Sequence, residues 1–280
     1  MQNPVIKRIF DFSCAVIGLA ALSPLLILIA AAIWAEDRHS PFFLGRRIAR
    51  RNDGDDERSF SYFSMVKFRS MIPDAWKNGV SSTANGDRRI TRVGSLMRRA
   101  KLDELPQLWN VLVGEMSLVG PRPQVETDAS LYTPIERRML TVRPGVTDLA
   151  SIVFSDEGSI LASAGSGAGN ADLLYNQIIR PWKSRLALLY LEHGSIASDL
   201  QVILLTLIGA VSRERALAGV EQMLRKWNAE PLLIQMASRR DPLIAWPPPG
   251  SLEIVTSYPK TPALPVRVEP PPQTSRATHA

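Results

Sequence analysis

Two adjacent carboxylates, Asp103 and Glu104, stand at the start of a segment whose apolar residues recur at helical spacing. Asp is a favoured N-cap residue and Pro106 is tolerated in a first helical turn, so we predict that both acids lie at a helix N-terminus. The unpaired N–H groups and the helix dipole there favour ionised carboxylates, and they would also favour a nearby phosphate. One acid could act as a nucleophile and the other as a ligand for a divalent cation. The competing interpretation is that the pair only caps the helix.

Basic residues gather around this pair. Six of them precede it with no acid among them, and Arg122 follows it between two prolines. Arginine and lysine make charge-assisted hydrogen bonds to phosphate, so this density of positive charge indicates a polyanionic ligand. The six preceding residues are Arg88, Arg89, Arg92, Arg98, Arg99 and Lys101.

The composition sets bounds on the kind of protein. The chain has 280 residues, 45% hydrophobic and 21% charged, which is typical of a globular protein of one or two domains. The net charge of +6 and the pI of about 9.7 indicate an anionic partner, which is a nucleic acid, a membrane surface or a phosphorylated substrate. The basic charge is not interleaved with aromatics in a recognisable module, so we expect no nucleic-acid partner.

The cysteine and histidine content narrows the metal chemistry. The single cysteine, Cys14, lies in an apolar run, which excludes an intramolecular disulfide and favours a cytoplasmic setting. His39, His193 and His279 are scattered without ligand spacing, which argues against a zinc site. Any metal should therefore be held by oxygen atoms.

An uncharged run covers residues 12–35 and is long enough to cross the hydrocarbon core of a membrane. Ser23-Pro24 sits at its midpoint, where proline should kink a helix and the serine hydroxyl could satisfy part of the freed backbone. Basic residues flank both ends, beginning with Lys7 and Arg8, and pull both flanks toward the cytoplasm. The residues alone leave two alternatives, a re-entrant helix and an ordinary membrane-spanning helix.

The central part of the chain holds three further basic features. Residues 60–71 alternate apolar and polar positions as a short strand does, which puts Lys67 and Arg69 on one face. Residues 90–100 are predicted to form an amphipathic helix whose arginines face either an anionic bilayer or solvent. Arg143 begins an Arg-Pro-Gly turn that could hold phosphate or could be a plain turn.

The C-terminal half is predicted from composition and periodicity. Residues 155–170 are rich in Gly, Ser and Ala, which predicts a mobile loop or lid, and residues 175–192 are predicted to be helical. Residues 202–211 are too few to span a membrane, so their helix is either buried or interfacial. Ten of the 21 prolines fall in the last 40 residues, which predicts a disordered tail. We therefore expect a membrane-embedded segment at 1–39, a catalytic domain at 40–240 and a tail at 241–280.

Two long segments carry a family resemblance. Residues 102–112 read Leu-Asp-Glu-Leu-Pro-Gln-Leu-Trp-Asn-Val-Leu, and residues 114–123 read Gly-Glu-Met-Ser-Leu-Val-Gly-Pro-Arg-Pro. This gap-free match resembles the signature of the bacterial sugar transferases, which are also called monotopic phosphoglycosyl transferases or polyprenyl-phosphate sugar-1-phosphate transferases. The resemblance extends from about residue 7 to about residue 211. The other residues that match motifs of this family are Lys7, Arg8, Asp11, Ser23, Pro24, Lys-Phe-Arg-Ser-Met at 67–71, Arg-Pro-Gly at 143–145, Tyr190, Ser195, Asp199 and Leu200.

The resemblance implies an activity. A member moves sugar-1-phosphate from a UDP-sugar donor to a membrane polyprenyl phosphate acceptor, giving a polyprenyl-diphosphate sugar and UMP as the first membrane step of surface glycan synthesis. It implies Asp103 as a catalytic nucleophile that forms a phospho-aspartyl intermediate, and Glu104 as a catalytic residue and ligand of Mg²⁺. The residues implied to bind substrate phosphate are Arg98, Arg122, Lys67, Arg69 and Arg143.

The resemblance also implies an architecture. It favours re-entry at Ser23 and Pro24, and it places a small, helix-rich α/β catalytic domain with interfacial amphipathic helices on the cytoplasmic face of the bacterial inner membrane, in contact with lipid. A homo-oligomer is compatible with the sequence. Many members continue the Arg-Pro-Gly turn with Gly, an aromatic or Leu, and Gln-Val, whereas this chain has Asp148-Leu-Ala, so the sugar is not identified. The competing class is a membrane-anchored basic scaffold that binds anionic lipid without catalysis.

Overall fold

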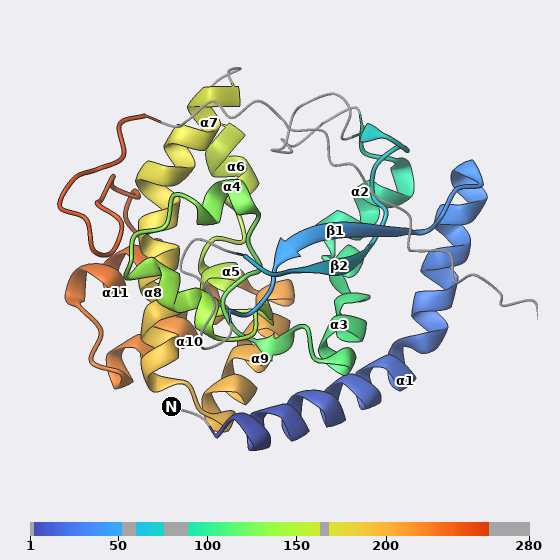
Figure 1. Cartoon of the computed structure of the whole chain (residues 1–280), viewed down its shortest axis with the longest axis horizontal. Coiled ribbons are helices and arrows are strands. Elements are labelled where there is room, and N and C mark those ends of the chain that lie inside the picture. Colours follow the sequence, from blue (N-terminus) through green and yellow to red (C-terminus); the bar gives the residue numbers. More distant parts are fainter. Residues whose placement is uncertain (1–2, 52–59, 76–88, 163–167, 258–280) are drawn as a thin grey trace, which may run out of the picture.

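A long apolar helix, α1 (Pro4–Asp37), borders a helix-rich body that contains two small β-sheets (Figure 1). The computed structural model describes residues 3–51, 60–75, 89–162 and 168–257, and Arg88 lies outside the described residues. The further elements are β1 (Phe42–Ile48), β2 (Tyr62–Phe68), α2 (Arg92–Arg99), the 3₁₀ turn η2 (Leu102–Glu104), α3 (Gln107–Val113), β3 (Ser117–Val119), α4 (Glu126–Ala129), the 3₁₀ turn η3 (Glu136–Thr141), β4 (Gly145–Thr147), α5 (Leu149–Val153), α6 (Glu157–Ala162), α7 (Ala168–Leu174), the π-helical turn η4 (Tyr175–Ile179), α8 (Arg180–His193), α9 (Ile196–Val211), α10 (Arg213–Lys226) and α11 (Pro231–Ser238).

Helix α1 is capped at both ends and bends in the middle. Asn3 caps its start through hydrogen bonds to two backbone N–H groups, and Arg38 ends it in the left-handed conformation. Pro24 cannot donate to the carbonyl of Ala20, and the Ser23 hydroxyl donates to that carbonyl instead at 2.8 Å. Figure 1 shows the helix running along the lower edge and then turning upward. The predicted kink is therefore present, and its cause is the Ser-Pro pair.

The N-terminal end of α1 is held to the body by a buried charge network. The Lys7 ammonium lies 2.8 Å from Asp199 and 3.1 Å from Asp11, and the Tyr190 hydroxyl donates to Asp199 at 2.6 Å. Asp11 also accepts a hydrogen bond from the backbone of Leu118 in β3. Two sequence motifs nearly two hundred residues apart therefore meet in one cluster.

The C-terminal end of α1 is held as firmly. Asp37 accepts two hydrogen bonds from the Arg69 guanidinium, each 2.6 Å long, just beyond β2. The neighbouring Glu36 accepts from the backbone N–H of Arg92 at the start of α2. Both ends of the apolar helix are thus attached to the same body.

Strands β1 and β2 pair antiparallel, with Phe43 opposite Lys67, which confirms the predicted strand. Helix α3 covers the free edge of β2 through Asn110, whose side chain accepts from Val66 N–H at 2.9 Å and donates to the Ser64 carbonyl at 2.8 Å. A side chain thereby satisfies backbone groups that would otherwise need a third strand. The strand that carries Lys67 is fixed in this way to the helix that follows the acid pair.

Strands β3 and β4 pair in parallel, and their approach requires glycine. A Cβ atom built on Gly145 would lie 2.2 Å from the backbone nitrogen of Gly120, a separation that no side chain permits. The contact brings the segment after β3, which contains Arg122, against β4. The predicted Arg-Pro-Gly turn is thus the start of a strand.

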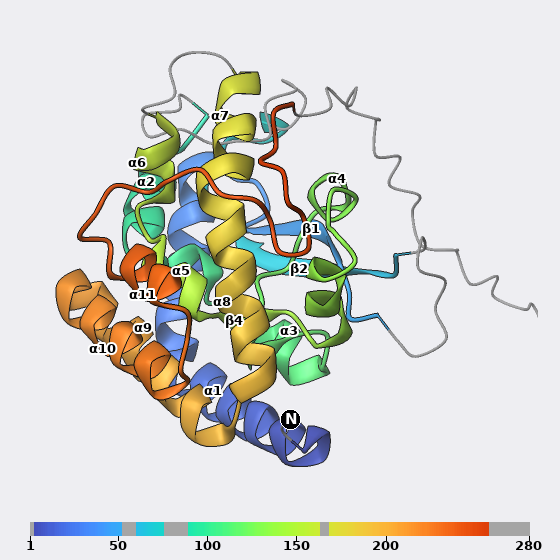
Figure 2. The ribbon, with the colours of Figure 1, turned by 90° about the vertical axis from the view of Figure 1, so that its left-hand side faces the viewer.

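Helices α5, α8, α9, α10 and α11 form the main core around buried Trp182, Leu186 and Val220 (Figure 2). Helix α9 has a buried face that includes Val202 and an exposed face that includes Leu207, of which 65% is accessible. The sequence left open whether this helix is buried or interfacial. One of its faces is buried and the other is exposed, as an interfacial face would be. The predicted amphipathic helix at 90–100 is confirmed as α2.

Two predictions of irregular structure are wrong in part. Within the predicted loop at 155–170 the structure forms α6 and the start of α7, and residues 163–167 lie outside the described residues. Asp156 fixes the entry to α6, because Arg213 and Arg239 each form a 2.9 Å ion pair with it. Composition alone could not show these partners, which come from distant helices.

The predicted tail is also ordered in its first part. Residues 242–257, here the C-terminal strap, lie along α8, and their carbonyls accept hydrogen bonds from Trp182, Arg185 and Thr133. Prolines need no hydrogen-bond acceptor and favour an extended chain, so a proline-rich segment can lie extended against a helix once side chains of the body donate to its carbonyls. The predicted disorder therefore does not hold for residues 242–257, the domain boundary at 241 stays a prediction, and the remainder of the predicted tail lies outside the described residues.

Candidate active site

The acid pair lies in a tight turn rather than at a helix cap. Asp103 and Glu104 belong to η2, which follows Lys101 in the left-handed conformation with φ of 53°, and α3 begins only at Gln107. Among the described residues no side chain caps η2 or α3, and Pro106 precedes α3. The prediction that Asp103 is an N-cap is wrong, because the turn at Lys101 and the proline separate the acids from the helix. The competing interpretation of the pair as a cap fails for the same reason, so both carboxylates are available for chemistry.

Glu104 is held by two cations. Its Oε1 atom lies 2.6 Å from the Arg122 guanidinium and 3.0 Å from the Lys67 ammonium. Burial alone would raise the pKa of Glu104, but the charges and hydrogen bonds of Arg122 and Lys67 outweigh burial and lower it to about 2. Glu104 is therefore a permanent anion whose second oxygen is left for another ligand.

Asp103 lies in a different electrostatic environment. Burial and then the charge of Glu104 raise its pKa, and the more distant charges of Lys67 and Arg98 only partly oppose them. The expectation that the local environment favours both anions holds only for Glu104. A carboxylate with a raised pKa is the more basic of the two and, once ionised, the stronger nucleophile.

The predicted phosphate-binding residues fall into two groups. Lys67 and Arg122 contact Glu104 directly, and Arg98, which is half-buried in the last turn of α2, contributes positive charge at Asp103. Arg69 instead forms the ion pair with Asp37 and also bonds the Ser40 carbonyl, so its guanidinium is occupied.

Arg143 is also remote from the acid pair. Its Nε donates at 2.8 Å to the carbonyl of Gly114, at the opposite end of α3 from the acids. Cations at a helix C-terminus satisfy its free carbonyls, and Arg8 does the same for Val111 and Leu112. The described structure thus gives Arg69 and Arg143 structural partners away from the acid pair, and their predicted phosphate-binding roles stay predictions.

Oxygen atoms suited to a divalent cation are present at the acid pair. Glu104 uses only Oε1 for Arg122 and Lys67, and Asp103 makes no hydrogen bond or ion pair to another side chain in the described ranges. No group of three or more potential ligand residues occurs among the described residues. Mg²⁺ is commonly bound by one or two carboxylates that leave its other positions to substrate phosphates and water, so the donor set fits such an ion.

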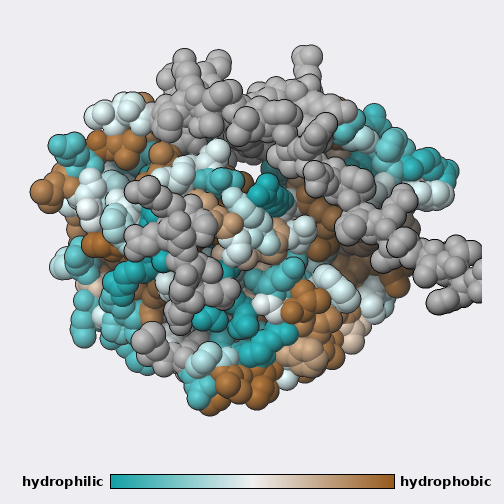
Figure 3. Space-filling model, in the orientation of Figure 1, coloured by the Kyte–Doolittle hydropathy of each residue, from teal (hydrophilic) through white to brown (hydrophobic). Residues whose placement is uncertain are grey.

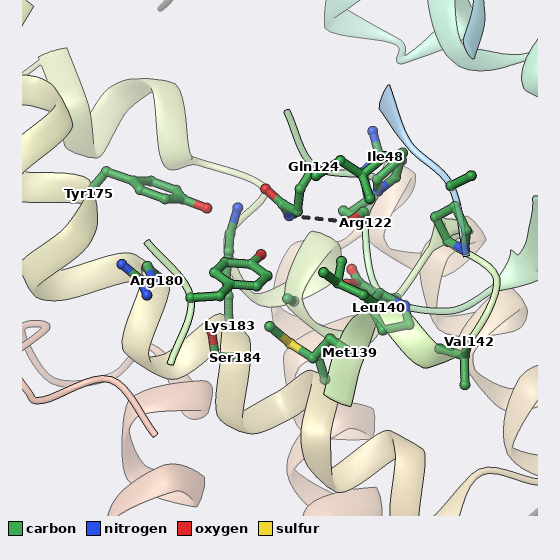
Figure 4. A pocket seen from close by; sticks show the side chains of 18 residues that line it. Ile48, Arg122, Gln124, Met139, Leu140, Val142, Tyr175, Arg180, Lys183 and Ser184 are labelled. Atoms are coloured by element: carbon green, nitrogen blue, oxygen red, sulfur yellow. Dashed lines mark hydrogen bonds between the residues drawn. The ribbon is translucent and has the colours of Figure 1, made fainter. Parts of the chain in front are cut away.

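A pocket opens beside Arg122, between the segment after β3, η3 and α8 (Figure 4). Tyr175 directs its hydroxyl group into this pocket, and Lys183 rises from α8 toward its centre. Asp148, which caps α5, belongs to the lining as well. Because Arg122 contacts both the pocket and Glu104, the pocket adjoins the acid pair.

Sequence reasoning missed the residues that position this site. Asn110 fixes α3 to β2, and a signal for it exists, since a polar side chain lies among apolar residues on the buried face of a helix. Tyr175, Lys183 and Asp148 come from three separate elements, and no local pattern in the sequence joins them.

Comparison with known proteins supports a family assignment. The profile of a family described as bacterial sugar transferase matches residues 2–213. The UDP-N-acetylgalactosamine-undecaprenyl-phosphate N-acetylgalactosaminephosphotransferase of Aeromonas hydrophila is 37% identical over 151 residues, which are 53% of this chain and 34% of the relative. The undecaprenyl-phosphate glucose phosphotransferase of Komagataeibacter xylinus is 37% identical over 208 residues, which are 72% of this chain and 35% of the relative.

A shorter relative gives a similar result. Exopolysaccharide production protein ExoY of Sinorhizobium fredii is 37% identical over 161 residues, which are 52% of this chain and 68% of the relative. The chain thus spans about a third of the length of the first two relatives and about two thirds of the third. Since the family profile covers well over half of the chain, this protein belongs to the bacterial sugar transferase family.

Proposed function

We propose that this protein transfers sugar-1-phosphate from a UDP-sugar to a membrane polyprenyl phosphate, and so initiates synthesis of a surface polysaccharide. The observation that carries the proposal is the pair of unequal carboxylates, one held as an anion by Arg122 and Lys67 and the other half-buried with no ion pair to any described residue. The relatives named as undecaprenyl-phosphate sugar phosphotransferases support the same reaction. UDP-sugar and undecaprenyl phosphate are therefore the substrates we assign.

The transfer proceeds in two displacements. An oxygen of Asp103 attacks the phosphorus that carries the sugar, the bond from that phosphorus to the bridging oxygen breaks, and UMP leaves with the electron pair. A phosphate oxygen of the polyprenyl phosphate then attacks the same phosphorus, and the carboxylate of Asp103 leaves unchanged. The donor is water-soluble while the acceptor is fixed at the bilayer, so a covalent intermediate separates two encounters that would otherwise have to coincide.

The remaining residues of the site are proposed to bind the donor diphosphate and to neutralise its negative charge. Arg122 and Arg98 are placed to make charge-assisted hydrogen bonds to the donor diphosphate, and Lys67 holds Glu104 in position. Mg²⁺ bound by Glu104 and the diphosphate would neutralise negative charge that otherwise repels Asp103. Without such neutralisation a carboxylate would approach a polyanion.

The membrane helix is proposed to enter and leave the bilayer on the cytoplasmic side. Both ends of α1 are bound to one body, through Lys7 at its start and Asp37 at its end, and the bend at Pro24 lies between them. A straight spanning helix would place these ends on opposite faces. Figure 3 shows apolar surface along the lower and right-hand edges, where α1 lies in Figure 1.

Exposed apolar side chains on neighbouring helices extend this surface and are proposed to lie at the bilayer interface. They are Ile17, Ile27 and Leu28 of α1, Trp109 and Val113 of α3, and Leu204, Leu207 and Val211 of α9. The proposal places the acid pair at the cytoplasmic surface of the bacterial inner membrane, within reach of the polyprenyl phosphate.

Re-entry is tested by cysteine labelling in a Cys14→Ser background. Cysteines replacing Asn3 and His39 should both react with an impermeant reagent only from the cytoplasmic side. Cysteine replacing Leu252, which is 98% accessible on the strap, provides the cytoplasmic reference. Labelling of positions 3 and 39 from opposite sides would establish a spanning helix instead.

The reaction is tested by measuring Mg²⁺-dependent UMP release from a panel of UDP-sugars in the presence of undecaprenyl phosphate. Mass spectrometry of protein quenched after addition of a UDP-sugar alone should find a sugar-phosphate on the peptide that contains Asp103. Asp103→Asn should lose both the adduct and turnover. A scaffold that only binds anionic lipid would release no UMP, and intersecting double-reciprocal plots without an adduct would indicate direct transfer in a ternary complex.

A further inference from the structure

The pocket beside Arg122 has an unusual balance of charge. Each cation that lines it is held by a carboxylate outside the lining. The pairs are Arg122 with Glu104, Arg180 with Glu136, and Lys183 with Glu157. Asp148 is the only acid of the described lining, and it forms no ion pair there. The pocket therefore contains one carboxylate, Asp148, that no ion pair occupies.

Several polar groups of the pocket have no hydrogen-bond partner among the described residues, and they are two phenol hydroxyls and two acceptor oxygens. Asp148 uses Oδ1 to accept from the backbone of Ser151 at 2.6 Å, which leaves its other oxygen, and Gln124 donates through its amide nitrogen to the Arg122 carbonyl, which leaves the amide oxygen. The hydroxyls of Tyr132 and Tyr175 make no hydrogen bond to any described residue. Burial raises the pKa of both tyrosines well above its usual value, so both keep their protons.

A sugar ring matches these groups better than a uracil ring does. Each sugar hydroxyl both donates and accepts, so neighbouring hydroxyls can bond a carboxylate, an amide oxygen and a phenol together. Uracil presents two carbonyl acceptors and one N–H donor, so it could bond the two phenols but would leave either the carboxylate oxygen of Asp148 or the amide oxygen of Gln124 without a donor. The carboxylate of a uronic acid would be repelled by the carboxylate of Asp148, because the cations of the lining are already paired with other carboxylates.

We infer that this pocket binds the sugar of the donor, and that it selects an uncharged hexose over a uronic acid through Asp148. The inference rests on the proposed function for the identity of the donor as a UDP-sugar. Arg122 lies at the junction, so the diphosphate is held beside Glu104 while the sugar extends toward Tyr175 and α8. The uridine then lies outside this pocket.

The test measures binding without turnover, so that it does not depend on catalysis. Calorimetry in nanodiscs with the Asp103→Asn protein gives dissociation constants for UDP-glucose, UDP-galactose, UDP-N-acetylgalactosamine, UDP-glucuronic acid and UMP. The measurements are repeated with Asp148→Asn introduced into the Asp103→Asn protein, because asparagine can still cap α5 but carries no charge. Asp172→Asn is the matched control, since it makes the same change outside the lining.

Asp148→Asn should weaken the best-bound neutral UDP-hexose by roughly tenfold and leave UMP binding unchanged, because UMP has no sugar. Tyr175→Phe should weaken the same ligand by roughly threefold to tenfold, again without an effect on UMP. In the protein that keeps Asp148, UDP-glucuronic acid should bind more weakly than UDP-glucose does. Asp148→Asn should reduce the difference between these two dissociation constants. Asp172→Asn should change none of these constants.

Three results would overturn the inference. Equal weakening of UMP and the UDP-hexose would place uridine in the pocket. Unchanged binding of every ligand in both variants would place the sugar elsewhere, and preferential binding of UDP-glucuronic acid would refute the role of Asp148. A failure of the proposed catalysis would be distinguishable from these results. In that case the protein that keeps Asp103 would bind a UDP-hexose through this pocket but would release no UMP.

Discussion

Neutralising the two acids one at a time should have unequal effects on the stability of the fold. Glu104→Gln removes a charge that Arg122 and Lys67 stabilise, whereas Asp103→Asn removes a charge that burial and Glu104 oppose. Both substitutions are nearly isosteric, so packing is preserved. We expect Glu104→Gln to destabilise the fold and Asp103→Asn to leave it unchanged or more stable, although both should impair the reaction.

The magnitude follows from the pKa of Glu104. A fall from its ordinary value of 4.5 to about 2 corresponds to about 3 kcal/mol of unfolding free energy at neutral pH. Because the folded-state pKa lies below the unfolded one, this stabilisation is fully present above about pH 4.5 and is lost as the pH falls toward 2. Glutamine keeps an oxygen that accepts hydrogen bonds, so we expect Glu104→Gln to cost roughly 2 kcal/mol.

The assay is thermal unfolding in nanodiscs between pH 4 and pH 8. A loss of roughly 2 kcal/mol should lower the Tm of Glu104→Gln by roughly 4–8 °C at neutral pH, and the difference from the unmodified protein should shrink below about pH 4.5. For Asp103 the sign is reversed, because its folded-state pKa is raised and its charge costs stability as the pH rises. Equal loss of stability in the two variants would refute the assignment of unequal environments.

Three further tests, two of them with a control substitution, address other parts of the structure. Trp246→Ala removes a ring stacked on the core from the strap and should cost roughly 2–3 kcal/mol in chemical denaturation, whereas Leu252→Ala, at a fully exposed strap position, should cost nothing measurable. Lys7→Met leaves two buried carboxylates without their cation and should cost roughly 3 kcal/mol or more, seen as increased proteolysis of the body. Arg98→Ala should lower kcat/KM for UMP release by roughly tenfold or more, whereas the adjacent exposed Arg99→Ala should have little effect, and equal losses would indicate only general attraction to anionic lipid.

The sequence allowed the prediction of features that depend on local chemistry. The kink at Pro24 follows from a missing N–H group, and the strand around Lys67 follows from alternation, so neither needed knowledge of distant residues. The acid pair was found for a similar reason, because two carboxylates next to a basic cluster are informative in themselves.

The sequence could not show the partners that the chain brings from elsewhere. Arg69 carries the charge expected of a phosphate ligand, but Asp37, from the end of another element, uses its guanidinium. Asp103 has the residue type of an N-cap, but the left-handed turn at Lys101 removes it from α3. The strap was predicted as disordered because its stabilising donors, such as Trp182, lie in α8. In each case the residue type was read correctly and its partner was decided by tertiary structure.

The same tertiary partners explain how the membrane helix determines the position of the acid pair. At the start of α1, Arg8 binds the last carbonyls of α3, the helix that follows the two acids. At its end, Asp37 binds Arg69, which directly follows the strand that carries Lys67. With α1 in the bilayer as proposed, its depth would set the height of both elements that frame Glu104 and Asp103. In the proposed reaction the acceptor phosphate has a fixed height at the membrane surface, so Asp103, held between these two elements, would meet it without a separate docking motion.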